Sequence, residues 1–165
     1  MKPGSKLLWV FISLLIGIIA CDNETKVCDQ SLTTSLQMRF YKPDSSALGN
    51  PSGNVRDTTL RNVTLFALTR DKDSVYKSVP ASRVYLSLNL LTDVSRFYLR
   101  IDSFSVPDTI NFYYKRSQHF VSPGCGFATF FVLDSVTSTH NSIDSLKLIL
   151  REVNADNDTN INLYF

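Results

Sequence analysis

The chain is poor in the residues from which catalytic and metal sites are usually built. Its 165 residues include only two histidines and three cysteines. Neither His119 nor His140 stands in a zinc-ligand spacing, and no serine has a candidate base beside it in the sequence. Six glycines leave little for a nucleotide-binding loop, and neither a phosphate loop nor a Gly-x-Ser-x-Gly motif occurs. These absences predict a protein that is not an enzyme and that carries no cofactor.

An excess of charge of one sign is also lacking. The chain has 17 basic and 15 acidic residues, and two of the basic ones, Lys2 and Lys6, lie at the extreme N-terminus. The chain that follows them is formally neutral and has no basic stretch. A neutral chain argues against nucleic acid as a partner and against electrostatic docking on anionic lipid.

The N-terminus has the pattern of a secretory signal that ends in a cysteine. The apolar run Leu7–Ile19 is shorter than the roughly twenty residues needed to span a bilayer. Ala20 and Cys21 follow it, and a small residue before a cysteine is what lipoprotein processing requires. Residues 1–20 are therefore predicted to be a cleaved signal helix, with Cys21 acylated, by palmitate for instance, and bound to the membrane through its acyl chains. Ile18 departs from the pattern, in which leucine is usual, and an uncleaved anchor helix is the alternative.

The other two cysteines, Cys28 and Cys125, are predicted to form a disulfide bond. An exported protein folds in an oxidising compartment, and an even number of cysteines remains once Cys21 is acylated. The bond would close a loop of about 97 residues and stabilise the fold by about 4–5 kcal/mol if native strain is small. Two buried free thiols are the alternative.

Apolar and polar residues alternate along most of the remaining chain. This two-residue periodicity is typical of strands that bury one face. The alternating sets are Leu36/Met38/Phe40, Val63/Leu65/Ala67, Val84/Leu86/Leu88/Leu90, Phe97/Leu99/Ile101, Ile110/Phe112/Tyr114, Leu146/Leu148/Leu150 and Ile161/Leu163/Phe165. About eight short strands separated by turn signals predict an all-β fold, a single antiparallel β-sandwich. Residues 21–35 are predicted to be a lipidated tether, and residues 36–165 the β-sandwich domain.

Four segments carry more particular predictions. Phe127–Leu133 is almost continuously apolar, which indicates a strand covered on both faces. The polar segment Arg70–Lys77 is predicted to be a turn. Lys42–Asp57 has loop composition and is long for a hairpin connection, so it is the predicted functional surface. Ser142–Glu152 has helical propensity, but the strict alternation within it favours a strand.

A set of motifs follows in a distinctive order along the chain. Cys28 comes shortly after the lipobox, and the first predicted strand ends in Arg39-Phe40-Tyr41. A Thr-Ile-x-Phe-x-Tyr strand at Thr109–Tyr114 and a Val-Ser-x-x-Cys-Gly-Phe segment at Val121–Phe127 come later. In this order the motifs resemble a family of small lipoproteins of Bacteroidota-type bacteria, whose domain has no assigned function. The resemblance implies a lipid-anchored β-domain and supplies no catalytic residues.

The best candidate for a metal site is the group Asp156, Asp158 and Asn160. Oxygen ligands on alternate residues resemble the start of a calcium-binding loop. Ile161 stands where that loop needs glycine, and no glutamate closes the pattern. A polar turn before the last strand is the favoured interpretation, and no metal is predicted.

The function predicted from these features is a non-enzymatic binding or structural role in the envelope, on a lipoprotein anchored in the outer membrane. An envelope protein or a glycan would be its partner. One alternative is a small eight-stranded outer-membrane barrel, a single closed sheet, because the terminal Tyr164-Phe165 resembles a barrel-assembly signal. Another is a hydrolase with an unrecognised site. The residues leave open the ligand, the membrane face, the oligomeric state and whether any Asp-Ser or Asp-Thr pair is glycosylated.

Overall fold

The computed structural model describes residues 33–43, 55–69, 74–156 and 158–165. The predicted signal peptide, Cys21, Cys28 and most of the predicted tether lie outside the described residues. Most of the Lys42–Asp57 segment lies outside them too. The described part of the chain contains no helix that could cross a membrane.

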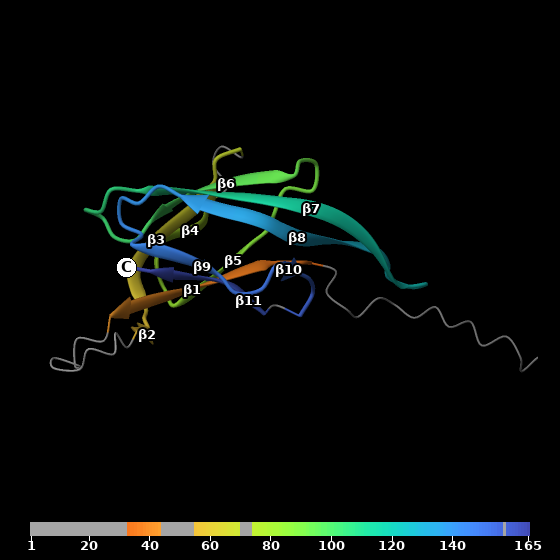
Figure 1. Cartoon of the computed structure of the whole chain (residues 1–165), viewed down its shortest axis with the longest axis horizontal. Helices are drawn as coiled ribbons and strands as arrows, with labels where there is room; N and C mark the ends of the chain where they lie inside the picture. Colours follow the sequence, from red (N-terminus) through yellow and green to blue (C-terminus); the bar gives the residue numbers. More distant parts are fainter. Residues whose placement is uncertain (1–32, 44–54, 70–73, 157) are drawn as a thin grey trace, which may run out of the picture.

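The described strands form two sheets packed face to face, so the predicted all-β sandwich is confirmed (Figure 1). The first sheet has the order β2-β1-β11-β9, with β5 also paired to β1; its strands are β1 (Leu36–Pro43), β2 (Val55–Asp57), β5 (Arg83–Leu86), β9 (Ser145–Leu148) and β11 (Thr159–Tyr164). The second sheet has the order β10-β8-β7-β6-β3-β4; its strands are β3 (Leu60–Ala67), β4 (Ser74–Ala81), β6 (Val94–Arg100), β7 (Asp108–Ser122), β8 (Gly126–Ser138) and β10 (Glu152–Val153). The alternative of a single closed sheet of eight strands is therefore wrong.

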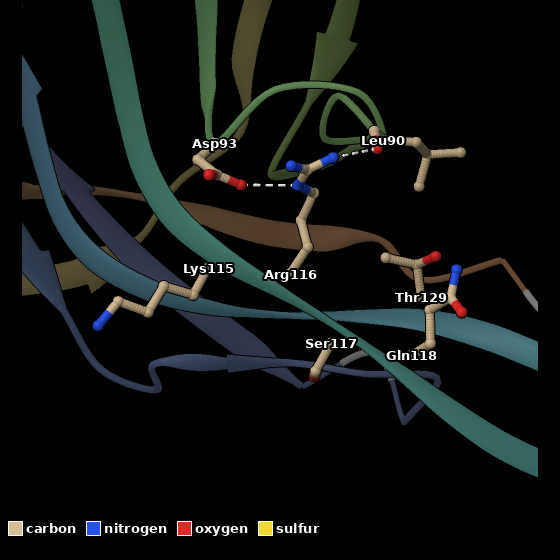
Figure 2. Close-up of a pocket in the computed structure, with 7 residues that line it drawn as sticks. All are labelled: Leu90, Asp93, Lys115, Arg116, Ser117, Gln118 and Thr129. Atoms are coloured by element: carbon tan, nitrogen blue, oxygen red, sulfur yellow. Dashed lines mark hydrogen bonds and ion pairs between the residues drawn. The ribbon is translucent and has the colours of Figure 1, made fainter.

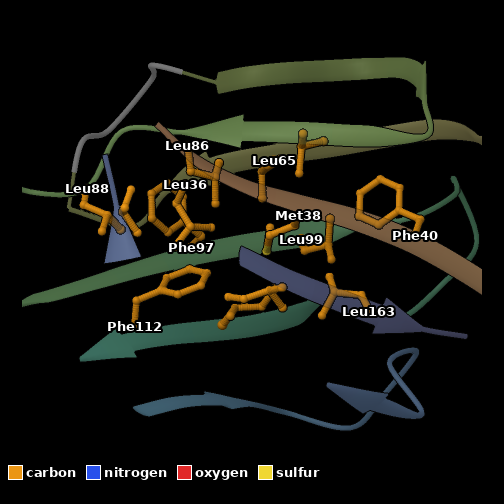
Figure 3. Close-up of a cluster of buried hydrophobic side chains, with 14 of the residues drawn as sticks. Leu36, Met38, Phe40, Leu65, Leu86, Leu88, Phe97, Leu99, Phe112 and Leu163 are labelled. Carbon is orange, nitrogen blue, oxygen red and sulfur yellow. The ribbon is translucent and has the colours of Figure 1, made fainter. Parts of the chain in front are cut away.

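The core lies between the two sheets and is built from the alternating residues that the sequence singled out. Side chains of both sheets meet there, as Figure 3 shows, because each strand turns every second residue inward. The labelled members are Leu36, Met38 and Phe40 of β1, Leu65 of β3, Leu86 of β5, Phe97 and Leu99 of β6, Phe112 of β7, Leu163 of β11 and the nearby Leu88. The prediction for Leu90 is wrong, since its side chain is exposed in the connection between β5 and β6.

The prediction that Phe127–Leu133 is covered on both faces is also wrong. Phe131 and Leu133 are buried, but Val132 between them is exposed and Phe127 is 65% exposed. The run belongs to β8, which buries one face against the first sheet. Val132 lies on the outward face of the strand, whereas Phe127 lies on the same face as Phe131 and is exposed near the turn at the end of the hairpin.

The described residues form eleven strands, more than the number predicted, and β4 is the largest one missed. It begins inside the predicted turn Arg70–Lys77 and lies at the edge of the second sheet. Most of its side chains are exposed, Pro80 lies within it, and Ser78 has a φ of 50°. Edge strands tolerate proline and irregular pairing, so the alternating pattern that marks a half-buried strand is absent. The sequence also did not predict β2, which lies at the end of the predicted Lys42–Asp57 loop.

The first and last described strands lie side by side in the first sheet. β1 and β11 run parallel, whereas the other described pairs are antiparallel. The register shifts between Gln37 and Met38, which leaves Asn160 of β11 as an extra residue. The Asn160 Oδ1 accepts a hydrogen bond from the Gln37 N–H at 2.9 Å, so a side chain takes the place of a backbone acceptor.

The same asparagine also holds a corner at which the chain changes sheets. The chain leaves β9 in the first sheet and enters β10 in the second within a few residues. The Asn160 Nδ2 donates to the carbonyl oxygens of Leu150 at 3.3 Å and Glu152 at 2.7 Å. One buried amide therefore joins both terminal strands to the corner between the sheets.

A buried carboxylate organises the opposite connection, between β8 and β9. Asp108 is 1% exposed, and its carboxylate accepts hydrogen bonds from the Thr139 hydroxyl at 2.9 Å and from the backbone N–H groups of Asn141, Ser142 and Ile143 at 2.8, 2.9 and 3.1 Å. Buried donors that lose their acceptor retain their desolvation cost. The carboxylate is thus the main polar support of this connection.

Replacing Asp108 by asparagine should lower the free energy of unfolding by on the order of 3 kcal/mol, because an amide NH2 group would face buried N–H donors. The urea midpoint should fall while its slope stays unchanged. Asp102→Asn is the matched control: the Asp102 carboxylate is exposed and accepts from the N–H groups of Phe104 and Ser105. That control should change stability by less than about 1 kcal/mol. Equal midpoints for the two variants would contradict the role given to Asp108.

Candidate functional site

Strands β7 and β8 continue as a two-stranded hairpin beyond the rest of the second sheet (Figure 1). The neighbouring β6 pairs with β7 only as far as Tyr113, and the Tyr114 N–H makes a last hydrogen bond to the Asp93 carbonyl at 3.0 Å. From Lys115 to Phe120, β7 pairs with β8 alone among the described strands, and β8 pairs on its other side with β10 only at Phe131 and Val132, so the hairpin is two-stranded beyond Arg116. We call Lys115–Phe130 the hairpin end.

Two adjoining cavities lie at the hairpin end. The first, of about 480 Å³, is lined by charged and polar side chains: Asp93, Lys115, Arg116, Ser117, Gln118 and Thr129 (Figure 2). The second, of about 340 Å³, has an apolar wall of Leu88, Phe127 and Phe131 and is bordered by Thr33 and Thr34. Leu90 and Thr129 line both cavities. The site can therefore contact polar and apolar parts of one ligand.

Arg116 holds the connection between β5 and β6 against the hairpin. Its Nε lies 2.6 Å from the Asp93 Oδ1, and its Nη1 donates to the Leu90 carbonyl at 2.6 Å. Figure 2 shows the guanidinium between these two groups, with the Lys115 side chain pointing elsewhere. Arg116 is thus already bonded within the protein, whereas the side chains of Lys115 and Gln118 make no hydrogen bond or ion pair within the described residues. The two side chains lie on opposite faces of β7, and each is available to a polar ligand on its own face.

A buried hydroxyl pair fixes the same connection from inside. The Asn89 N–H donates to the Ser95 Oγ at 2.8 Å, and the Tyr114 hydroxyl donates to the Asn89 carbonyl at 2.9 Å. The Ser95 hydroxyl must then donate to the Tyr114 oxygen, 2.7 Å away. Burial raises the pKa of Tyr114 above its usual 10.0, although the hydrogen bond that its oxygen accepts from Ser95 acts in the opposite direction.

Two aromatic pairs lie on opposite faces of the hairpin end. Phe120 and Phe127 pack edge to face across the strands with ring centres 5.4 Å apart, and they are 59% and 65% exposed. His119 stacks on Phe130 at 4.6 Å. Such cross-strand pairs stabilise a ribbon that has little core of its own.

A serine lies beside a histidine here, contrary to the prediction that none does. The Ser117 Oγ lies 3.0 Å from the His119 Nε2, because both side chains project from the same face of β7. The alternation of residues along β7 could have indicated this pair. Nucleophilic catalysis also needs a third group that orients the histidine, and no hydrogen bond of that kind to His119 occurs in the described ranges. The pair is an exposed polar contact of the strand surface.

Cys125 lies in the turn between β7 and β8 and is partly buried. Its N–H donates to the carbonyl and hydroxyl oxygens of Ser122, at 3.2 and 3.1 Å. Gly126 follows with a φ of 73°, a conformation that other residues rarely adopt. The predicted partner, Cys28, lies outside the described residues, as does Cys21, so both predictions stand as made.

The residues named as weak calcium candidates are not turned toward one site. Asn160 is buried and its side-chain oxygen is bonded to the Gln37 N–H, as described above. Asp156 is exposed and its carboxylate accepts from the Asn154 amide at 2.8 Å; Asp158 is exposed as well. Across the described ranges, no group of three or more His, Cys, Asp or Glu side chains could hold a metal ion.

The raised pKa of Tyr114 predicts a pH dependence of stability. A tyrosine that keeps its proton more tightly when folded contributes stability below its unfolded pKa of about 10, and this contribution is lost as pH rises through the folded pKa. Tyr114→Phe should lower stability by about 1–2 kcal/mol at neutral pH, since Asn89 and Ser95 lose a partner. The difference between the two proteins should then shrink above about pH 10, as measured by urea unfolding in a pH series. A stability difference between the two proteins that does not change with pH would contradict the raised pKa of Tyr114.

Comparison with known proteins places the chain in a family. Residues 62–165 match the model of DUF6452, described as a family of unknown function. The match begins within β3 and runs to the last residue, so it contains the hairpin end and leaves out β1 and β2. No curated protein and no solved structure matches the chain. Because the match covers more than half of the sequence, the protein belongs to the DUF6452 family.

Proposed function

We propose that this protein is a lipid-anchored, non-enzymatic binding protein of the bacterial outer membrane and that the hairpin end is its binding surface. The observation that carries the proposal is the pair of adjoining cavities, one polar and one apolar, beside the point at which the described chain begins. The resemblance to small lipoproteins and the Ala20-Cys21 motif support the lipid anchor. An envelope protein, a glycan or lipid would be the ligand, on either face of the membrane.

The chemistry of the hairpin end supports binding over catalysis. Lys115, Gln118 and Thr129 offer hydrogen-bonding groups, and the neighbouring cavity offers apolar surface. The closest approach to a catalytic arrangement is the Ser117–His119 pair, which lacks an orienting acid in the described ranges. A shallow polar and apolar surface without such a set is typical of recognition.

The start of the described chain lies against the hairpin. The Thr34 hydroxyl donates to the Thr129 carbonyl at 3.0 Å, and Thr33 borders the apolar cavity. Cys21 precedes Thr33 by twelve residues, a stretch that spans at most about 40 Å when extended. A lipid on Cys21 would therefore hold the hairpin end close to the membrane.

The same contact supports a Cys28–Cys125 disulfide. Cys28 lies six residues before Thr34, and Cys125 lies four residues before Thr129. An extended residue spans about 3.3 Å, so six residues cover the distance from Thr129 to the hairpin turn. In this proposal the bond fastens the tether to the turn.

The lipid anchor is tested by expressing a Cys21→Ala variant in the native bacterium or a related one and separating membrane from soluble fractions. The variant should move from the membrane fraction to the soluble fraction, because the neutral chain offers no electrostatic substitute for acyl chains. Cys28→Ala is the control and should stay with the membrane. A Cys21→Ala variant that remains in the membrane fraction would rule out acylation as the means of attachment.

The disulfide is tested by mass spectrometry of unreduced peptides from the purified mature protein. We expect one cross-linked peptide that contains Cys28 and Cys125. Breaking the bond in a Cys28→Ser variant should cost about 2–5 kcal/mol of stability, seen as a lower urea midpoint. Recovery of both cysteines as free thiols would remove the disulfide from the proposal and leave the lipid anchor untouched.

A further inference from the structure

Several apolar side chains at the hairpin end are exposed to solvent, where they add little to the hydrophobic core. Phe120 and Phe127 are 59% and 65% exposed at the far end of the longest hairpin, and Leu90 and Leu91, beside it, are 59% and 85% exposed. Leu90 and Phe127 line the same cavity. We call these four residues the apolar tip. Phe104 and Val106, in the connection between β6 and β7, are also exposed, by 99% and 61%, but the apolar tip adjoins a cavity and the start of the described chain. Exposed apolar groups gathered in this way indicate a surface that is covered in use.

We propose that the apolar tip rests in the interface of the lipid bilayer to which Cys21 is anchored. Phe120 and Phe127 then lie at the boundary between headgroups and acyl chains, where aromatic rings are favoured. This inference rests on the lipid anchor proposed above and adds the orientation of the domain and the identity of the ligand class, membrane lipid.

The tether places the apolar tip nearer to the membrane than the other end of the sandwich. The described chain begins beside Thr129 of the hairpin end, at most about 40 Å of extended chain from Cys21. The opposite end is marked by Phe104, which is 99% exposed in the connection between β6 and β7. Phe104 precedes β7, whereas Phe120 lies near its end, and a fifteen-residue strand is about 50 Å long.

Charge and area both favour lipid over a protein partner. The segment from Lys115 to Phe127 contains two cations and no carboxylate, and the nearby Asp93 carboxylate is already paired with Arg116, so no unpaired acidic group faces the phosphate headgroups. The exposed parts of the two phenylalanines amount to about 250 Å², and those of Leu90 and Leu91 add a similar area. A stable protein complex buries about 800 Å² on each partner. A small apolar contact is enough to orient a domain that acyl chains already hold at the membrane surface.

The absence of tryptophan from the predicted mature chain permits a direct test. Trp9, the only tryptophan, lies in the predicted signal peptide. Phe127→Trp therefore gives a single fluorophore at the apolar tip, and Phe104→Trp gives a matched one at the opposite end. Each lipidated variant is purified and reconstituted into phosphatidylethanolamine–phosphatidylglycerol vesicles, with and without bromine on the acyl chains.

The tryptophan at position 127 should shift its emission to the blue on reconstitution and lose intensity with brominated lipid. The tryptophan at position 104 should do neither. Because the contact is apolar, raising the salt concentration to about 1 M should not reverse the quenching. If Phe127→Trp folds poorly, Phe120→Trp reports on the same surface and should show the same blue shift and quenching.

Four results would overturn the inference. Equal quenching at positions 104 and 127 would show a domain without a preferred end toward the lipid. A blue shift at 127 without quenching would show that a second copy of the chain covers the tip. A protein that does not float with the vesicles would overturn the lipid anchor and this orientation with it, whereas a protein that floats with an unquenched tip would overturn the orientation alone.

Discussion

The parallel pairing of β1 and β11 is the contact on which the first sheet depends. β2 and β5 both attach to β1, and β9 attaches to β11, so without this pair the sheet would separate into unconnected pieces. Asn160 makes the pairing specific, because its amide bonds β1 on one side and the corner before β10 on the other. A buried amide with its donors and acceptor satisfied fixes the register of the strands more firmly than apolar contacts alone.

This pairing also determines where the site can form. Once β1 lies beside β11, the residues just before β1 reach β8, where the Thr34 hydroxyl donates a hydrogen bond to the Thr129 carbonyl. β6 has 7 residues, whereas β7 and β8 have 15 and 13, so the hairpin extends past its neighbour and leaves an open strand edge. The connection between β5 and β6 packs beside this edge through Arg116 and Tyr114, and the polar cavity is the space that remains.

The sequence predicted the parts of the fold in which a strand buries one face. Residues such as Met38, Phe112 and Leu163 alternate with polar neighbours and lie in the core. It failed for β4, whose edge position removes the alternation, and for Phe127–Leu133, where apolar composition reflects an exposed tip and not a second buried face. A two-residue period does not reveal strand direction, so the parallel pair was not predictable. The cavities join residues distant in sequence, which no local pattern identifies.

The hairpin end has little core to stabilise it, and it is also the part of the fold best suited to binding. A two-stranded ribbon is marginally stable in water, and the exposed Phe120 and Phe127 bury little surface within the domain. Its order comes from cross-strand aromatic pairs and from the Arg116 contacts, both of which are local. Such a segment belongs to the least stable units of a protein, in which binding surfaces are commonly found. Contact with a surface that covers Phe120 and Phe127 would stabilise the ribbon, so binding and local order would be coupled.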